Sequence, residues 1–251
     1  MKKYKIGIAL SGGGVRGFAH LGVLQALNER GIFPEIVSGT SAGSIAGAFY
    51  CAGYSPHDAL EIMKTKKFSD FTKIHIPKDG FFGLENLKLI LENNIKQLNF
   101  EDLNIPLYVC VSNLNTGKVE YVNKGPLHDM ILASSAIPVV FSPVKIGKTY
   151  YVDGGLIDNL PVKPLVRLCN DIITVNVFPN DENQKFDSLL QVAIRSFQMN
   201  MNNNIKYIKS KSTVFLEPAA LSKYHILKTK YQEEIFEIGY KYAKKAKFEL
   251  S

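Results

Sequence analysis

The chain has 251 residues, of which 46% are hydrophobic and 21% are charged, and this balance excludes disordered and fibrous proteins. A chain of this length can bury one sizeable core, so we expect a single domain over residues 1–251. The formal net charge of +7 favours approach to anionic surfaces, but the lysines are dispersed and no base-reading module is recognisable, so we expect no nucleic-acid partner.

The cysteines and the N-terminal segment indicate the compartment. Cys51, Cys110 and Cys169 are odd in number, and each lies in an apolar stretch, which favours buried thiols over a disulfide framework or a metal site. Residues 1–10 contain three lysines but too short an apolar run for a secretory signal, and no stretch reaches the length of a membrane span. We expect a cytoplasmic protein, and peripheral contact with an anionic membrane surface stays open. We expect neither a cofactor nor a metal.

Short apolar runs alternate with segments of helical periodicity along the chain. Strands are predicted at residues 4–10, 35–38, 107–112, 118–122, 144–152, 172–177 and 213–216. Helices are predicted at residues 21–31, 42–53, 56–66, 84–97, 127–136, 186–209 and 230–247. This alternation predicts an α/β fold in which a largely parallel central sheet is covered by helices on both faces.

The loop Gly12-Gly13-Gly14-Val15-Arg16-Gly17 follows the first predicted strand and fits two kinds of site. It satisfies the G-x-G-x-x-G pattern of dinucleotide-binding folds, but those folds need an acidic residue at the end of the second strand, where this chain has Gly39. Consecutive glycines at a helix N-terminus also expose backbone N–H groups to an anion, as an oxyanion hole requires. Arg16 is expected to fix this loop or to carry charge. Taken alone, the glycine motif is equally consistent with a tight turn that has no chemistry.

The segment Gly39-Thr40-Ser41-Ala42-Gly43 fits the G-x-S-x-G pattern of a nucleophile elbow. A short strand is predicted before it and an Ala/Gly-rich helix after it, which is the context that this motif requires. We therefore interpret Ser41 as a nucleophile and the flanking Gly39 and Gly43 as residues that permit the sharp turn.

A serine nucleophile needs a base, and none of the histidines is well placed for this role. Only one of them, His225, lies late in the sequence; the others are His20, His57, His75 and His128. Asp153-Gly154-Gly155 follows the predicted strand 144–152, with two glycines that leave room beside the carboxyl group. Asp-Gly-Gly is also a common turn sequence, so this segment alone does not identify a base.

Taken together, the three motifs resemble the patatin-like phospholipase family. The resemblance runs from about residue 5 to residue 180, and it also includes Ala133-Ser134-Ser135-Ala136-Ile137-Pro138 and Asn159 with Pro161. It implies a three-layer α/β/α fold and hydrolysis of acyl esters of lipids, with phospholipids as the leading class. It also implies a dyad of Ser41 and Asp153 that uses no catalytic histidine, and an oxyanion hole in the glycine loop.

Three expectations accompany this resemblance. An aspartate with the ordinary pKa of about 3.9 is a weak base, so we expect burial to raise the pKa of Asp153. Ser11 stands where many relatives carry an aspartate, which puts in doubt a carboxylate contact to Arg16. Residues 66–84 mix phenylalanines with lysines and are interpreted either as a lid or entrance facing lipid, or as a small satellite core.

The alternative function is that of a regulatory or adaptor protein that has the patatin fold but only weak catalytic activity.

Overall fold

The central strands of the sheet are apolar runs that are buried on both faces, as parallel strands covered by helices must be. In the computed structural model, which describes residues 3–64, 84–179, 189–201 and 204–251, β1 (Tyr4–Leu10) pairs in parallel with β2 (Ile36–Thr40) and with β7 (Cys169–Val175). The parallel part continues from β2 to β3 (Leu107–Asn113) and from β7 to β8 (Val214–Leu216).

The other side of the sheet is antiparallel. Both β4 (Lys118–Val122) and β6 (Thr149–Asp153) pair with β3, and β5 (Val144–Ile146) pairs with β6. The prediction of one strand over residues 144–152 is therefore wrong. Residues 147 and 148 form a two-residue hairpin loop in which Gly147 has φ +60°, a conformation that glycine adopts without steric cost.

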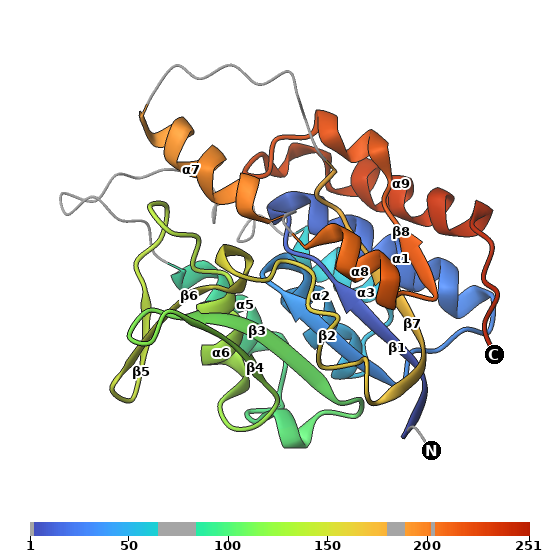
Figure 1. Ribbon diagram of the computed structural model, residues 1–251, viewed down its shortest axis with the longest axis horizontal. Helices are drawn as coiled ribbons and strands as arrows, with labels where there is room; N and C mark the ends of the chain where they lie inside the picture. The colour runs from blue at the N-terminus through green and yellow to red at the C-terminus, as the bar shows by residue number, and fades with distance from the viewer. Residues whose placement is uncertain (1–2, 65–83, 180–188, 202–203) are drawn as a thin grey trace.

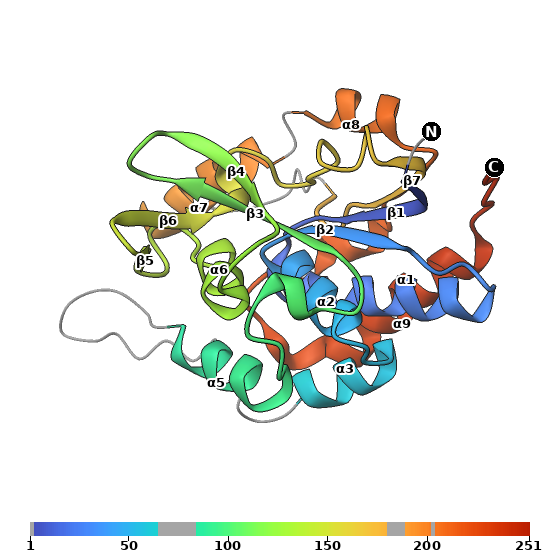
Figure 2. The ribbon, with the colours of Figure 1, turned by 90° about the horizontal axis from the view of Figure 1, so that it is seen from below.

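Helices cover both faces, which confirms the predicted α/β arrangement (Figures 1 and 2). One face carries α1 (Phe18–Glu29), α2 (Ala42–Cys51), α3 (Pro56–Met63), α5 (Glu85–Asn94), α6 (Leu127–Ser134) and α9 (Gln232–Lys245). The helix predicted at 186–209 is instead two helices, α7 (Leu189–Asn200) and α8 (Ile205–Lys211). The sequence between them is rich in asparagine, which favours turns over helix interiors.

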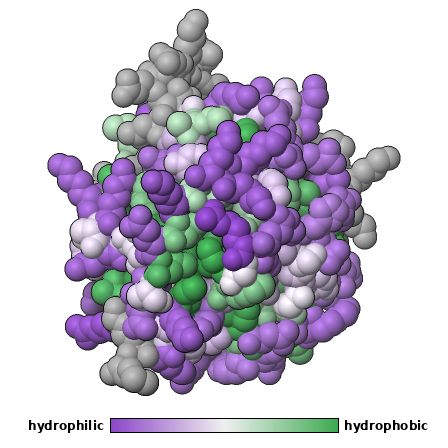
Figure 3. Space-filling view, turned by 90° about the vertical axis from the view of Figure 1, so that its right-hand side faces the viewer, coloured by the Kyte–Doolittle hydropathy of each residue, from purple (hydrophilic) through white to green (hydrophobic). Residues whose placement is uncertain are grey.

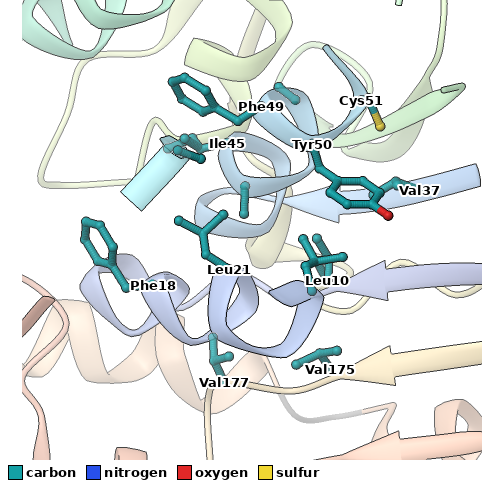
Figure 4. Packing of buried hydrophobic residues seen from close by; sticks show 14 of the residues in the cluster. Leu10, Phe18, Leu21, Val37, Ile45, Phe49, Tyr50, Cys51, Val175 and Val177 are labelled. Carbon is teal, nitrogen blue, oxygen red and sulfur yellow. The ribbon is translucent and has the colours of Figure 1, made fainter. Parts of the chain in front are cut away.

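The main core lies between the sheet and the helices α1 and α2. Figure 4 shows part of this cluster, with Phe18 and Leu21 from α1, Phe49 from α2, and Leu10 and Val37 from the strands. The three cysteines are free and buried, as the sequence predicts. Because this core is continuous beneath β1 and β2, the ends of these two strands are held firmly in place.

Two further observations concern the outside of the molecule. The face at the right of Figure 1 is mainly hydrophilic around a small apolar patch (Figure 3). Among the described residues, no helix combines the length and the apolar character needed to cross a membrane. Residues 66–83 of the predicted lid or entrance lie outside the described residues, so that interpretation stays a prediction.

Candidate active site

The register of β3 brings Ser41 and Asp153 together. Thr40, the last residue of β2, pairs with Cys110, and the next residue of β3, Val111, pairs with Asp153 at the end of β6. Ser41 directly follows Thr40, so two residues that are 112 positions apart (153 − 41) meet at one point of the sheet. The backbone pairing alone thus accounts for their proximity.

Ser41 occupies a sharp turn between β2 and α2. Its backbone has φ 51° and ψ −121°, a conformation that a non-glycine residue rarely adopts and that is found at strained functional turns. The flanking glycines are required by close backbone contacts: a Cβ at Gly39 would lie 2.5 Å from the Gly43 carbonyl oxygen, and one at Gly43 would overlap the Leu10 carbonyl. The G-x-S-x-G segment therefore forms the strand–turn–helix structure that the motif predicts.

A second serine holds the backbone of this turn. The Ser41 N–H donates to Ser134 Oγ at 2.8 Å, and the Ser134 hydroxyl donates to the Cys110 carbonyl at 2.7 Å. Sequence reasoning included Ser134 only as part of a family-like segment and missed this contact. No sequence signal identifies it, because the contact depends on how α6 packs against β3.

Asp153 is 1% exposed, at the point where β6 turns into the 3-10 helix Gly154–Leu156. Its Oδ1 accepts a hydrogen bond from the Gly155 N–H at 2.8 Å. Burial raises the pKa of Asp153 to about 7, against the opposing hydrogen bonds from the Gly155 N–H and the Ser41 hydroxyl. The Ser41 hydroxyl is thus close enough to affect this carboxyl, although Oδ2 has no hydrogen bond of ordinary geometry to any described residue.

The glycine loop lies beside Ser41, and its three predicted donors are not equivalent. The Gly12 N–H donates to the Asn159 carbonyl at 3.1 Å. Within the described residues, the N–H groups of Gly13 and Gly14 form no hydrogen bond, so these two are available to an anion. Gly14 has φ +57°, and a Cβ there would overlap the Ile226 carbonyl oxygen, so this position requires glycine.

Arg16 is 3% exposed and binds the C-terminal part of the chain. Its Nε donates to the Tyr224 carbonyl at 2.8 Å and its Nη2 to the Ser222 carbonyl at 2.9 Å. The guanidinium group also lies 5.1 Å from the centre of the Phe178 ring. Of the two roles expected for Arg16, these contacts match the role of fixing the loop. In these hydrogen bonds the partners of its side chain are main-chain carbonyl groups and not the carboxylate whose contact the sequence put in doubt.

Two of the described histidines, His20 and His225, have other contacts. His20 is buried, Nε2 lies 2.8 Å from the Ser11 carbonyl oxygen, and burial lowers the pKa of His20 to about 4, so the ring is neutral at pH 7. His225 is exposed, and its Nδ1 accepts a hydrogen bond from the Leu227 N–H. Ser11 accepts a hydrogen bond from the Val177 N–H through its Oγ, so its side chain holds the segment after β7 against the loop.

An apolar pocket opens from Ser41. Its empty volume is about 580 Å³, which includes the space open to solvent. The described residues that line it are Gly14, Val15, Gly17, Phe18, Ser41, Ala42, Ile45, Met63, Ser135, Ile137, Phe141, Ile226 and Leu227. Ser41 thus lies at the wall of a cavity whose other surfaces suit a hydrocarbon chain.

Comparisons with known proteins found a matching family model and several relatives. A family model described as patatin-like phospholipase matches residues 8–166. An uncharacterised NTE family protein of Mycobacterium tuberculosis is 31% identical over 170 residues, which cover 67% of this chain and 47% of the relative. The lysophospholipase NTE1 of Saccharomyces cerevisiae is 30% identical over 187 residues, covering 70% of this chain and 11% of the yeast protein. The chain spans about half the length of the mycobacterial relative and about a tenth of the yeast protein.

A solved structure shares the fold. The crystal structure of VipD from Legionella pneumophila superposes with a TM-score of 0.53 at 15% sequence identity, covering 96% of this chain and 66% of that chain. At this identity the similarity concerns the fold alone, and it includes nearly the whole chain.

Proposed function

Because this chain belongs to the patatin-like phospholipase family, we propose that it hydrolyses carboxylic esters of lipids with Ser41 as the nucleophile and Asp153 as the base. The observation that carries this proposal is the position of Ser41 between a buried carboxyl group and an apolar pocket. The family implies lipid ester substrates, and the pocket gives such a substrate a place for its acyl chain.

Acylation of the serine follows from these contacts. Asp153 accepts the proton of the Ser41 hydroxyl while the serine oxygen attacks the ester carbonyl carbon. Ser41 is the N-cap residue of α2, a helix of ten residues whose dipole favours negative charge at this end. The carbonyl oxygen, negatively charged in the tetrahedral intermediate, is bound by the N–H groups of Gly13 and Gly14. Each such donor contributes roughly 3–4 kcal/mol to the stabilisation of an acyl-transfer transition state. When the intermediate collapses, the bond from the acyl carbon to the alcohol oxygen breaks and Asp153 gives its proton to the leaving alcohol. The acyl group then remains on Ser41, and Asp153 is ionised again.

The pKa of Asp153 explains how a carboxylate can serve as the base. A general base is most effective when its pKa lies near the working pH, because it is then both available and basic. Burial brings Asp153 to this range, with a pKa of about 7. A histidine, whose ordinary pKa is about 6.5, is therefore not needed to reach it.

Contact with an anionic membrane surface is the second part of the proposal. The outer face of α7 exposes an apolar stripe of Leu189 (89% exposed), Val192 (47%) and Met199 (64%) at helical spacing. The inner face of the same helix supplies Phe197, which packs in one cluster with the pocket residue Phe141. Together with the net charge of +7, this stripe suits a lipid surface close to the pocket entrance.

The experiment is hydrolysis of a nitrophenyl acyl ester and of phospholipid in vesicles by five proteins. We expect activity in the wild type and in the control variants Ser210→Ala and Asp129→Asn, which change exposed residues. We expect Ser41→Ala and Asp153→Asn to lose activity by at least about 100-fold, because each removes a group that takes part in the proton transfer. Full activity in either dyad variant would show that the assignment is wrong, and an inactive wild type would favour the regulator or adaptor.

A further inference from the structure

Asn159 is a buried polar residue that the proposed acylation step does not use. Its backbone carbonyl accepts the Gly12 N–H at 3.1 Å, so the loop after β6 is tied to the glycine loop through the main chain. Its side chain is a different matter. The residue is 3% exposed, and neither Oδ1 nor Nδ2 has a hydrogen-bond partner among the described residues.

The amide of Asn159 lies in the corner formed by the nucleophile, the base and the glycine loop. A Cβ at Gly12 would lie 2.5 Å from Asn159 Oδ1 and 3.3 Å from Ser41 Cβ. A Cβ at Gly155 would lie 3.1 Å from Asn159 Oδ1 and 3.1 Å from Asp153 Oδ1. The amide is therefore adjacent both to the serine that becomes acylated and to the carboxyl that acts as its base.

Met201 closes this corner from the side of α7. Its Cε would lie 3.4 Å from a Cβ at Gly12 and 3.3 Å from one at Gly155. Asn200, the last residue of α7, donates a hydrogen bond to the Leu156 carbonyl and so holds the end of the helix over the turn after Asp153. The corner is thus small, polar on its inner side and covered by a methyl group.

Leaving a buried amide unpaired is unfavourable, because its polar atoms have lost their hydrogen bonds to water and gained none in return. Three buried atoms of these two neighbouring residues are unpaired among the described residues, namely Asn159 Oδ1, Asn159 Nδ2 and Asp153 Oδ2. A buried water molecule typically needs two to four polar partners, and this set provides them. Fixing the loop does not require the amide, because the main-chain carbonyl makes the contact with Gly12.

We infer that Asn159 and Asp153 bind the water molecule that hydrolyses the acyl-enzyme, an inference that rests on the proposed function. The water donates one hydrogen to Asp153 Oδ2 and the other to Asn159 Oδ1, which leaves a lone pair for the acyl carbonyl carbon. As the new carbon–oxygen bond forms, Asp153 takes a proton from the water. The bond from the acyl carbon to Ser41 Oγ then breaks, Asp153 returns the proton to Oγ, and a carboxylic acid leaves.

The test separates the two half-reactions in variant Asn159→Ala, using a nitrophenyl ester and rapid mixing. The initial burst reports acylation and the steady state reports deacylation. We expect acylation within about threefold of the wild type and deacylation slower by about 10- to 100-fold, since misplacing a reacting group has effects of this size. Acyl-enzyme should then accumulate in the mass spectrum, and added hydroxylamine, which needs no bound water, should capture a larger share of the acyl group.

A matched control and a second variant keep the inference testable. Asn113→Ala removes another buried asparagine, one whose side chain donates to Glu120 and accepts from the N–H groups of Asn115 and Thr116, and it should leave the ratio of the two rates unchanged. If Asn159→Ala does not fold, Asn159→Asp can be used instead, because it keeps the size of the side chain and an oxygen that accepts a hydrogen bond from the water. Its additional carboxyl should raise the pKa of Asp153 and move the pH profile of deacylation upward.

The outcomes differ from those that would overturn the proposed function. Equal loss of acylation and deacylation in Asn159→Ala, unchanged deacylation, or an unshifted pH profile in Asn159→Asp would overturn the water site. A wild type that forms no acyl-enzyme on Ser41 would instead overturn the proposed hydrolase activity itself.

Discussion

The carboxyl group of Asp153 owes its character to its surroundings. It is 1% exposed, and burial raises its pKa to about 7, while the two hydrogen bonds from Gly155 and Ser41 act in the opposite direction. An Asp-Gly-Gly turn on the surface would leave the same residue as a weak base with a pKa of about 3.9. Burial at the end of β6 therefore changes an ordinary turn residue into a candidate general base.

This pKa predicts how activity depends on pH. The base must be ionised to accept the proton of Ser41, so kcat/KM for a neutral nitrophenyl ester should rise with pH and reach half its plateau near pH 7. Stopped assays at constant ionic strength from pH 5 to 9 measure this profile. A profile that is flat down to pH 5 would show that Asp153 keeps an ordinary pKa or is not the base.

The same pKa predicts a stability gain in Asp153→Asn. Because the folded-state pKa lies above the ordinary 3.8, the carboxyl's contribution to stability is fully present below about pH 4 and is lost as the pH rises through 7. A neutral amide of the same size avoids this loss, so the variant should exceed the wild type by up to roughly 4 kcal/mol at pH 8, and by less at pH 5. Urea unfolding at pH 5 and at pH 8 measures the difference in the free energy of unfolding between the variant and the wild type. The same difference at both pH values would contradict the assigned pKa.

Among the helices, α1 and α9 approach each other most closely at two glycines. A Cβ at Gly22 would overlap the Phe236 carbonyl oxygen, and one at Gly239 would overlap the Ala19 carbonyl oxygen. Backbone atoms cannot move aside as a flexible side chain can. This contact brings the C-terminal helix against the helix that follows the glycine loop.

Gly239→Ala should therefore destabilise the protein although alanine is the better helix former. Overpacking of this kind costs about 1–3 kcal/mol, more than the gain of up to about 1 kcal/mol in helix propensity. Thermal unfolding followed by circular dichroism measures the effect, with the exposed Lys245→Ala on the same helix as the control. A Gly239→Ala variant as stable as the wild type would mean that the two helices separate without cost.

Much of the fold could be predicted from the sequence, because strands such as β1 and β4 are apolar or alternating runs with clear ends. The hairpin of β5 and β6 could not, since only Gly147 marks its turn within a run that resembles one strand. The motifs indicate Ser41 and Asp153, but their proximity depends on the register of β3. The orientation of the Asn159 amide and the contact of Ser134 depend on packing between distant segments, which no local pattern contains.

At the scale of the whole molecule, charge and apolar surface combine on the side of α7 and α8. The helix α8, which follows α7 in the chain, carries the exposed lysines Lys206, Lys209 and Lys211. Such a combination of basic and apolar residues suits binding at the headgroup region of an anionic bilayer. The apolar stripe of α7 lies on the helix whose inner face packs beside the pocket.

Charged substitutions in this stripe should weaken membrane association. Val192→Asp with Met199→Asp removes two exposed apolar side chains and should lower binding to vesicles with anionic lipid by at least about tenfold, because burial of each contributes roughly 1.5 kcal/mol or more. Sedimentation with vesicles measures this, and Tyr242→Asp on α9 is a matched control, since Tyr242 is also exposed. Equal binding by all three proteins would contradict a lipid-facing α7.

The most direct test of the dyad is labelling with a fluorophosphonate, which reacts only with an activated serine. The account predicts one labelled residue, Ser41, identified by peptide mass spectrometry, at a rate that increases with pH around 7 and falls by at least about 100-fold in Asp153→Asn. Labelling at another serine, or labelling of Ser41 at the same rate in Asp153→Asn, would contradict it.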